Sequence, residues 1–184
     1  MKVPIKKERI FRIIVESDDF TFKYIVEKSE LSKSFVSKVI KELEEKNILA
    51  SENGKILVLN KEGLLREWAS LKRKIFASKK PVKLFFILKE RIRKIFSNYC
   101  ISGTFAENLI NGQTDGEEII IYTNKLNLKL VRNYLSNKPN TFVYIYDPYI
   151  LKSSWNFRGW KLCSIPQICA DLLARGIYGD VAMD

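Results

Sequence analysis

Hydrophobic residues recur at helical spacing in four segments of the first half of the chain. These segments are Glu8–Ser17, Phe22–Lys28, Lys33–Lys46 and Lys61–Phe76. The third segment carries one apolar stripe, formed by Phe35, Val36, Val39, Ile40 and Leu43. Such a stripe is typical of a helix that packs one face on a core. Thr21 and Ser32 stand where N-caps belong, so the pattern predicts four helices with a short turn between the second and the third.

A two-residue turn signal follows the third predicted helix. Asn53-Gly54 separates the runs Ile48–Glu52 and Lys55–Leu59, and a type I′ turn needs positive φ at both central positions. We therefore expect a β-hairpin here. Helix, helix, turn, helix and hairpin, in this order, is the arrangement of a winged helix-turn-helix domain, whose third helix enters the major groove of DNA.

The second half alternates between strand and helix patterns. Strands are predicted over Tyr99–Ser102, Glu118–Thr123, Thr141–Tyr146 and Gly159–Ser164, and helices over Phe105–Ile110, Leu126–Leu135 and Pro166–Ala174. Leu84–Phe96 has helical spacing, although residues 82–88 alone also fit a strand. We expect an α+β fold, a winged helix-turn-helix followed by a small mixed α/β domain. Pro81 and the polar residues before it place the boundary between domains 1–77 and 78–184.

Composition narrows the range of functions. Hydrophobic residues make up 46% of the chain, enough for a core in each domain, and the net charge of +11 favours polyanionic partners, nucleic acid first. The absence of histidine excludes imidazole-based catalysis and imidazole-bound zinc. Three cysteines without CxxC spacing suggest neither a disulfide framework nor a metal site. With no signal peptide or membrane span in the pattern, we expect a cytoplasmic protein that needs no membrane, metal or cofactor.

Candidate DNA-binding residues lie on the polar side of the third helix and at the tip of the hairpin. They are Lys33, Ser34, Ser37, Lys38, Lys41, Asn53 and Lys55. Small hydroxyl residues permit close approach to the groove, and lysines reach flanking phosphates. Glu42, Glu44 and Glu45 oppose this interpretation unless the N-terminal half of the helix makes the contact. Two alternatives stay open: a merely solvated helix face, and a winged helix that binds protein.

Two segments of the second half resemble one known family. YCISGTFAENLING (Tyr99 to Gly112) and SIPQICADLLARGIYGDVA (Ser164 to Ala182) are similar to the motifs of AbiEi antitoxins, the regulators of type IV toxin-antitoxin operons. The resemblance implies a sequence-specific repressor of its own operon that binds double-stranded DNA, with a nucleotidyltransferase-like toxin as a possible partner and an open oligomeric state. Glu107 departs from the pattern, and the chain ends at Asp184, where a last helix of the family would begin.

An enzymatic alternative rests on Ser102-Gly103 followed by Asp115 and Glu117. These residues imitate the glycine-serine turn and paired carboxylates of nucleotidyltransferases, which hold a triphosphate and magnesium. Gly116 weakens a strand between the two acids, and the strand predicted from Thr141 offers no third acid, so we expect no catalytic residue and no enzymatic activity.

Two further features allow two interpretations each. The basic run from Lys72 to Lys94 either tracks phosphates or is a solvated helix. Trp155, Phe157 and Trp160, with Arg158, either stack bases or serve as core anchors.

Overall fold

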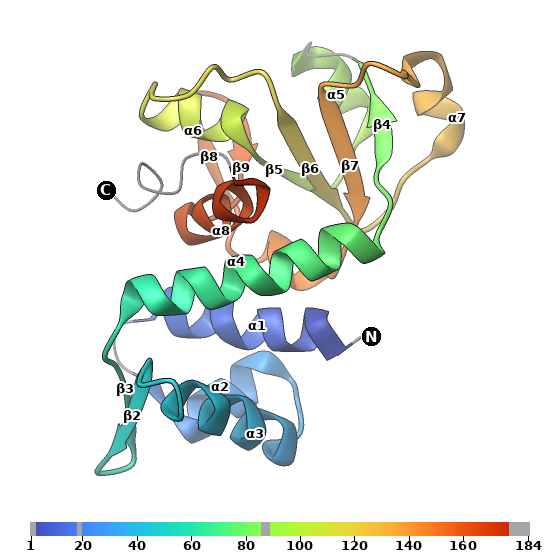
Figure 1. Cartoon of the computed structure of the whole chain (residues 1–184). Helices are drawn as coiled ribbons and strands as arrows, with labels where there is room; N and C mark the ends of the chain where they lie inside the picture. Colours follow the sequence, from blue (N-terminus) through green and yellow to red (C-terminus); the bar gives the residue numbers. More distant parts are fainter. Residues whose placement is uncertain (1–2, 18–19, 86–88, 177–184) are drawn as a thin grey trace. The chain divides into compact units, whose positions relative to one another are not determined.

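The computed structural model describes residues 3–17, 20–85 and 89–176, which form eight α-helices and two β-sheets in a mixed α/β architecture (Figure 1). The described residues divide into two compact units, one of residues 3–75 with 173–176 and one of residues 76–172. Both divisions fall inside continuous helices. The domain boundary expected between residues 77 and 78 stays a prediction.

The first unit contains four helices and a three-stranded sheet. Its elements are α1 Val3–Val15, β1 Phe20–Thr21, α2 Phe22–Ser29, α3 Lys33–Glu44, β2 Leu49–Glu52, β3 Lys55–Val58 and α4 Lys61–Ser78, whose last turn belongs to the second unit. β3 is the central strand and pairs antiparallel with β1 and β2. The predicted helices and hairpin are therefore present.

Local signals in the sequence explain where these elements start and turn. The Thr21 hydroxyl accepts a hydrogen bond from the Tyr24 amide at 3.1 Å, and the Ser32 hydroxyl accepts one from the Phe35 amide at 3.4 Å, so both expected N-caps are formed. Glu30 has a φ of 56° and ends α2 in the left-handed conformation. Asn53 and Gly54 both have positive φ, as the predicted type I′ turn requires.

The structure corrects the first half in three places. α1 begins at Val3 and ends at Val15, earlier than the predicted helix from Glu8 to Ser17, and the expected stop at Asp18-Asp19 lies outside the described residues. β1, only two residues long, is not predicted. Lys72 is fully buried, so the basic run that begins with it is not simply solvated.

The second unit is built on one mixed sheet of six strands. Its elements are β4 Val82–Leu84, α5 Lys89–Ile95, β5 Tyr99–Ser102, α6 Thr104–Ile110, β6 Ile119–Thr123, α7 Leu128–Val131, β7 Thr141–Ile145, β8 Trp155–Phe157, β9 Trp160–Leu162 and α8 Ile165–Arg175, whose last residues belong to the first unit. The strand order is β4-β7-β6-β5-β9-β8. β6 runs parallel to β7 and β5 parallel to β9, and the other pairs are antiparallel.

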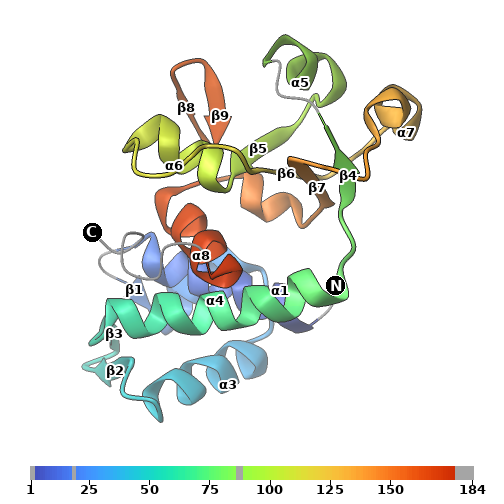
Figure 2. The same cartoon turned by 45° about the horizontal axis from the view of Figure 1, so that its top comes forward.

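The second half also departs from the predicted elements. The segment from Leu84 to Phe96 is divided between β4 and the short helix α5, because the first apolar residues pair with β7. The helix expected over 126–135 is only the four residues of α7 followed by a 3₁₀ turn at Arg132–Tyr134. β8 is not predicted, and it forms with β9 a hairpin at one end of the sheet, beside α6 (Figure 2).

One glycine is required at the turn from β5 into α6. Gly103 has a φ of 87°, and a Cβ atom there would lie 2.8 Å from the Glu118 carbonyl oxygen. A side chain at this position is therefore excluded both by backbone conformation and by contact. The glycine allows β5 to enter α6 directly, while the middle of the sheet is filled by Ile101, Ile120 and Tyr122 without exposure to solvent.

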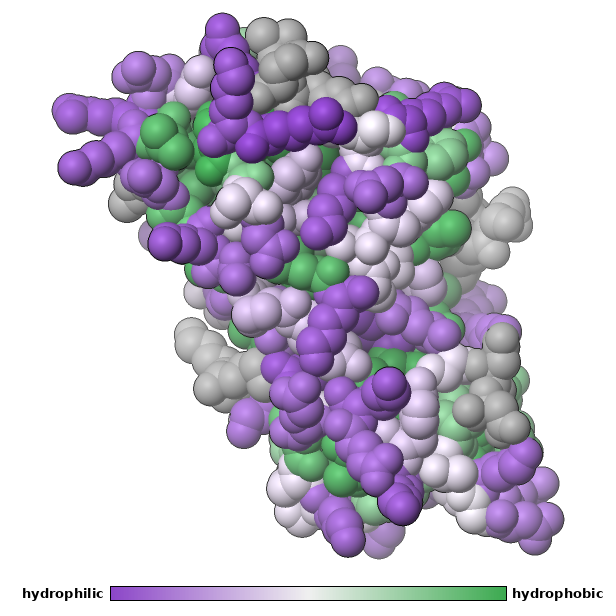
Figure 3. Space-filling view, turned by 180° about the vertical axis from the view of Figure 1, so that it is seen from behind, coloured by the Kyte–Doolittle hydropathy of each residue, from purple (hydrophilic) through white to green (hydrophobic). Residues whose placement is uncertain are grey.

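Hydrophilic residues dominate the molecular surface seen in Figure 3, with hydrophobic residues in small patches between them. None of the described helices has the length and apolar content needed to cross a membrane.

Candidate nucleic-acid interface

The predicted DNA-binding side of α3 is exposed. Its apolar stripe turns inward, with Val36, Val39, Ile40 and Leu43 buried. The opposite side exposes Lys33, Ser34, Ser37, Lys38 and Lys41. Among the residues that the structure describes, the three lysines enter none of the ion pairs. Their exposed side chains therefore form no ion pair, although the charge of Lys38 acts on the nearby Glu42.

The hairpin comes close to this helix and forms a groove with it. Ser37 and Lys41 of α3 and Gly54 and Lys55 of the hairpin line a groove of about 340 Å³. Asn53, at the hairpin tip, is exposed beside it. The fold therefore brings candidate residues from two separate segments to one place, while Lys33, Ser34 and Lys38 lie on α3 outside the lining of the groove.

The three acids of α3 have different surroundings. The Glu42 carboxylate forms an ion pair with Lys7 of α1, and the pKa of Glu42 is lowered mainly by this hydrogen bond; burial opposes the change, and the charges of Lys7, Lys38 and Lys46 add to it. Glu44 lines the groove and accepts a hydrogen bond from the Ser51 hydroxyl. Glu45 is exposed at the C-terminal end of α3. Only Glu44 thus places a carboxylate in the groove.

A buried ionic cluster, not predicted from the sequence, joins α1 to α4. One oxygen of Glu8 accepts hydrogen bonds from Lys72 at 3.1 Å, from the Trp68 indole at 3.2 Å and from Arg12 at 3.3 Å. All four side chains are at most 2% exposed. The sequence contains one sign of this cluster: its residues are spaced four apart on each helix, Glu8 with Arg12 and Trp68 with Lys72, in line with the apolar residues. The cluster holds the two helices together behind the interface.

The residues of the enzymatic alternative have different surroundings. Ser102 is buried and donates to Asp171 at 2.7 Å, and Tyr122 and Gln167 donate to the same carboxylate at 2.9 Å each. Asp115 and Glu117 are exposed in the loop before β6, where Asp115 accepts a hydrogen bond from the Glu117 amide. The serine hydroxyl is therefore bound to a buried carboxylate, whereas the two acids are exposed in the loop whose neighbouring residues, Thr114 and Glu118, form hydrogen bonds with Thr104. Asp171 is a buried acceptor that joins α8 to β5 and β6.

The described residues contain no group of three or more histidine, cysteine, aspartate or glutamate side chains arranged to hold a metal ion. Cys100 on β5 and Cys163 directly after β9 are buried with their sulfur atoms 3.0 Å apart, both as free thiols. Cys169 is partly buried and also free.

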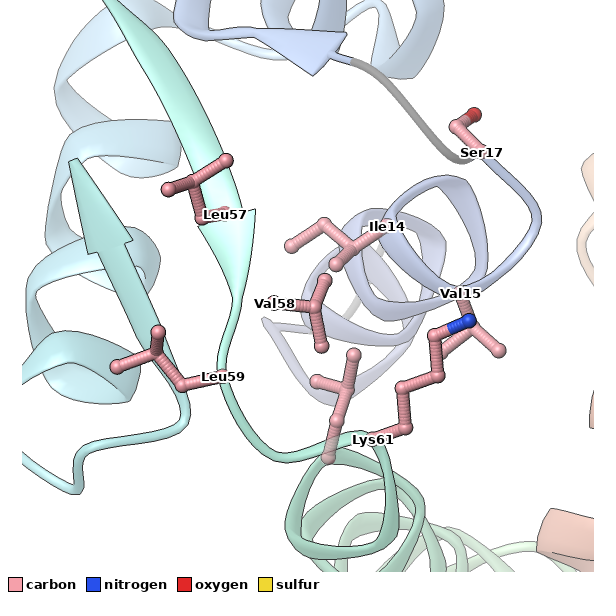
Figure 4. A pocket seen from close by; sticks show the side chains of 8 residues that line it. Ile14, Val15, Ser17, Leu57, Val58, Leu59 and Lys61 are labelled. Carbon is pink, nitrogen blue, oxygen red and sulfur yellow. The ribbon is translucent and has the colours of Figure 1, made fainter. Parts of the chain in front are cut away.

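An apolar pocket of about 390 Å³ lies between α1, β3 and α4. Figure 4 shows Ile14 and Val58 facing each other across it, with the Lys61 side chain beside Val15. β3 contributes residues both to this pocket and to the groove, but no residue lines both, so the two hollows are separate.

Comparison of the chain with protein-family models, with curated proteins and with solved structures found no match in any of the three.

Proposed function

We propose that the first unit is a winged helix-turn-helix that binds double-stranded DNA, with α3 in the major groove and the β2–β3 hairpin as its wing. The observation that carries the proposal is the exposed N-terminal half of α3, which carries two lysines and two serines and adjoins a groove where the wing brings Lys55 beside Ser37 and Lys41. The groove of B-DNA admits one helix, and lysines at its rim neutralise phosphates.

The chemistry of this face suits positioning on phosphates together with a close fit to base edges. Ser34 and Ser37 present hydroxyl groups that both donate and accept hydrogen bonds, and their small size leaves room for the helix in the groove. The net charge of +11 adds long-range attraction to a polyanion. Glu44 is the one feature of the groove that opposes binding, because its carboxylate repels phosphate.

The test replaces Lys33, Lys38 and Lys41 by alanine and measures binding to DNA from upstream of the protein's own gene by mobility shift. If each lysine neutralises one phosphate, the slope of log affinity against log salt should fall by about 2.7. A matched variant lowers the charge equally at exposed lysines of α4 and the segment after it, Lys61→Ala, Lys74→Ala and Lys80→Ala, and should keep most of the slope. Equal losses in both variants would show nonspecific attraction rather than reading by α3.

The regulatory part of the proposal rests on the resemblance to AbiEi antitoxins. We propose that the protein represses its own operon by occupying its operator, and that the second unit carries the antitoxin role toward a nucleotidyltransferase-like toxin. A reporter driven by the upstream promoter should be repressed by the wild-type chain and released by the α3 variant. Repression that persists in the variant would remove α3 from the mechanism.

A further inference from the structure

The hairpin formed by β8 and β9 carries its aromatic side chains on one face. Trp155 pairs with Leu162 and Phe157 with Trp160, so the alternation along the strands places the three rings on the same side. The Trp155 and Phe157 rings lie 5.2 Å apart, and Trp160 packs edge-on against Phe105 at 4.9 Å. All three rings of the hairpin are partly exposed.

These rings differ in how firmly they are held. Trp155 donates from its indole nitrogen to the Cys163 carbonyl oxygen at 2.9 Å, and Trp160 is fixed by Phe105, so both anchor the hairpin. Phe157 lies next to the exposed turn, where the Arg158 guanidinium sits 5.2 Å from its ring centre. The tip of the hairpin therefore offers two flat groups, a ring and a guanidinium, to solvent.

The turn itself positions the arginine. Arg158 and Gly159 have φ values of 47° and 77°, the two positive values of a type I′ turn. Asparagine, aspartate or glycine is usual at the first of these positions, and here an exposed arginine occupies it. Arg93 of α5 donates a hydrogen bond to the Gly159 carbonyl oxygen, so a second guanidinium lies against the same turn.

The hairpin and the segments next to it in sequence carry positive charge only. Residues 91–106 and residues 148–170 contain no aspartate or glutamate. Arg93, Arg158 and Lys161 bring positive charge to the turn and its strands, while Arg91 is directed to Tyr134, with its guanidinium 5.3 Å from that ring. We call Trp155, Phe157, Arg158 and Arg93 the aromatic-basic surface; Lys161 pairs with Asn156, so it lies on the opposite face of the hairpin.

We propose that the aromatic-basic surface binds single-stranded nucleic acid, with a base stacked on Phe157 and phosphates held by the guanidinium groups of Arg93 and Arg158. Partly exposed rings beside cations are the elements by which proteins hold single strands without reading their sequence. A duplex fits less well, because its bases are already stacked on one another and leave no free face for the ring. This site is separate from α3 and does not depend on the function proposed for the first unit.

The experiment uses the full chain and fluorescein-labelled oligothymidylate and oligouridylate of about 12 nucleotides, a length in the range that single-strand sites cover. Binding is measured by fluorescence anisotropy at low and moderate salt. Phe157→Leu keeps an apolar side chain but removes the ring, and should weaken binding about 5- to 100-fold. Phe157→Trp should restore it. The matched control is Phe85→Leu, which removes another exposed ring of the same unit and should leave the affinity unchanged.

Charge and competition complete the test. Arg93→Ala with Arg158→Ala should lower the salt slope, and these exposed positions keep the test valid should Phe157→Leu fail to fold. Wild-type affinity in Phe157→Leu would overturn the proposal. The proposal would also be overturned if a duplex of equal length bound more tightly than the single strand and lost this binding in Phe157→Leu. If the triple lysine variant of α3 loses single-strand binding as fully as Phe157→Leu does, the single-strand site is wrongly assigned to the aromatic-basic surface. If that variant loses only duplex binding, the assignment is supported.

Discussion

The Glu8 carboxylate is the residue on which the buried packing of α1 against α4 depends most. Replacing it by glutamine leaves Lys72 and Arg12 buried without the anion that they share, and removing one partner of a buried ion pair costs about 3 to 5 kcal/mol. We expect Glu8→Gln to lower the free energy of unfolding by that amount in urea, followed by circular dichroism. Glu67→Gln, which breaks the partly exposed pair with Lys46, should cost under about 1 kcal/mol. Similar costs for the two variants would contradict the cluster.

Cys169 should react slowly with alkylating reagents in the folded protein. Burial raises the pKa of its thiol to about 11, and the charges of Asp171 and Glu107 add to the increase. Because the thiolate is the reactive form, about one molecule in a thousand carries it at pH 8, and the rate should rise about tenfold per pH unit from there toward pH 11. Mass spectrometry after iodoacetamide treatment measures this rate. If the alkylation rate of the folded chain instead levelled off just above pH 8.5, the thiol would have an ordinary pKa. The chain unfolded in urea gives the rate of such an ordinary thiol for comparison.

At the scale of elements, the sequence predicted what is set by local signals. Two N-caps, the apolar stripe of α3 and the Asn53-Gly54 turn depend on neighbouring residues, and the structure has each of them. β1 and β8 were missed because two or three residues carry no periodicity and form strands only by pairing with β3 and β9. Lys72 was misjudged because burial beside Glu8 depends on a helix more than sixty residues away in sequence.

The candidate interface was predictable to the same extent. α3 and the two strands of the hairpin were predicted to within one or two residues at their ends, since their polar positions follow from helical and strand periods. The groove that joins Ser37 and Lys41 to Lys55 was not, because it depends on how β3 packs beside α3. The acids show the same limit: sequence placed Glu44 near the end of the helix, and only the fold places it in the groove.

The groove between α3 and the hairpin yields a prediction about Glu44. If duplex DNA lies along it, the Glu44 carboxylate repels the nearest phosphate, and Glu44→Gln keeps the acceptor for Ser51 while removing the charge. Two like charges near 4 Å in water interact with about 1 kcal/mol, so duplex affinity should rise about fivefold. Glu45→Gln, at an exposed position outside the groove lining, should change it less. Anisotropy with labelled upstream DNA measures both, and equal effects would place the DNA elsewhere.

At the scale of the whole chain, positive charge is distributed over both units rather than concentrated on one helix. The first unit has exposed lysines on α3, and the second unit has the cations of the aromatic-basic surface. The two proposals require different forms of nucleic acid, a duplex for α3 and a single strand for the aromatic-basic surface. The separate variants of α3 and Phe157 decide whether either surface acts alone.

The boundary between residues 77 and 78 can be tested by cutting the chain there. Fragment 1–77 keeps α1 to α3, the hairpin and nearly all of α4, with Trp68 as its one tryptophan, but it lacks Leu173, which belongs to the first unit, is 5% exposed and accepts a hydrogen bond from Arg73 at 3.1 Å. Loss of one buried leucine costs about 2 kcal/mol, so the fragment should fold and bind duplex DNA, with its free energy of unfolding lower by that amount. The reference is the full chain with Trp155→Phe and Trp160→Phe, in which Trp68 alone reports unfolding. An unfolded fragment would make the boundary wrong. Equal stability would instead mean that residues 173–176 contribute nothing to the first unit, although α8 carries them into it.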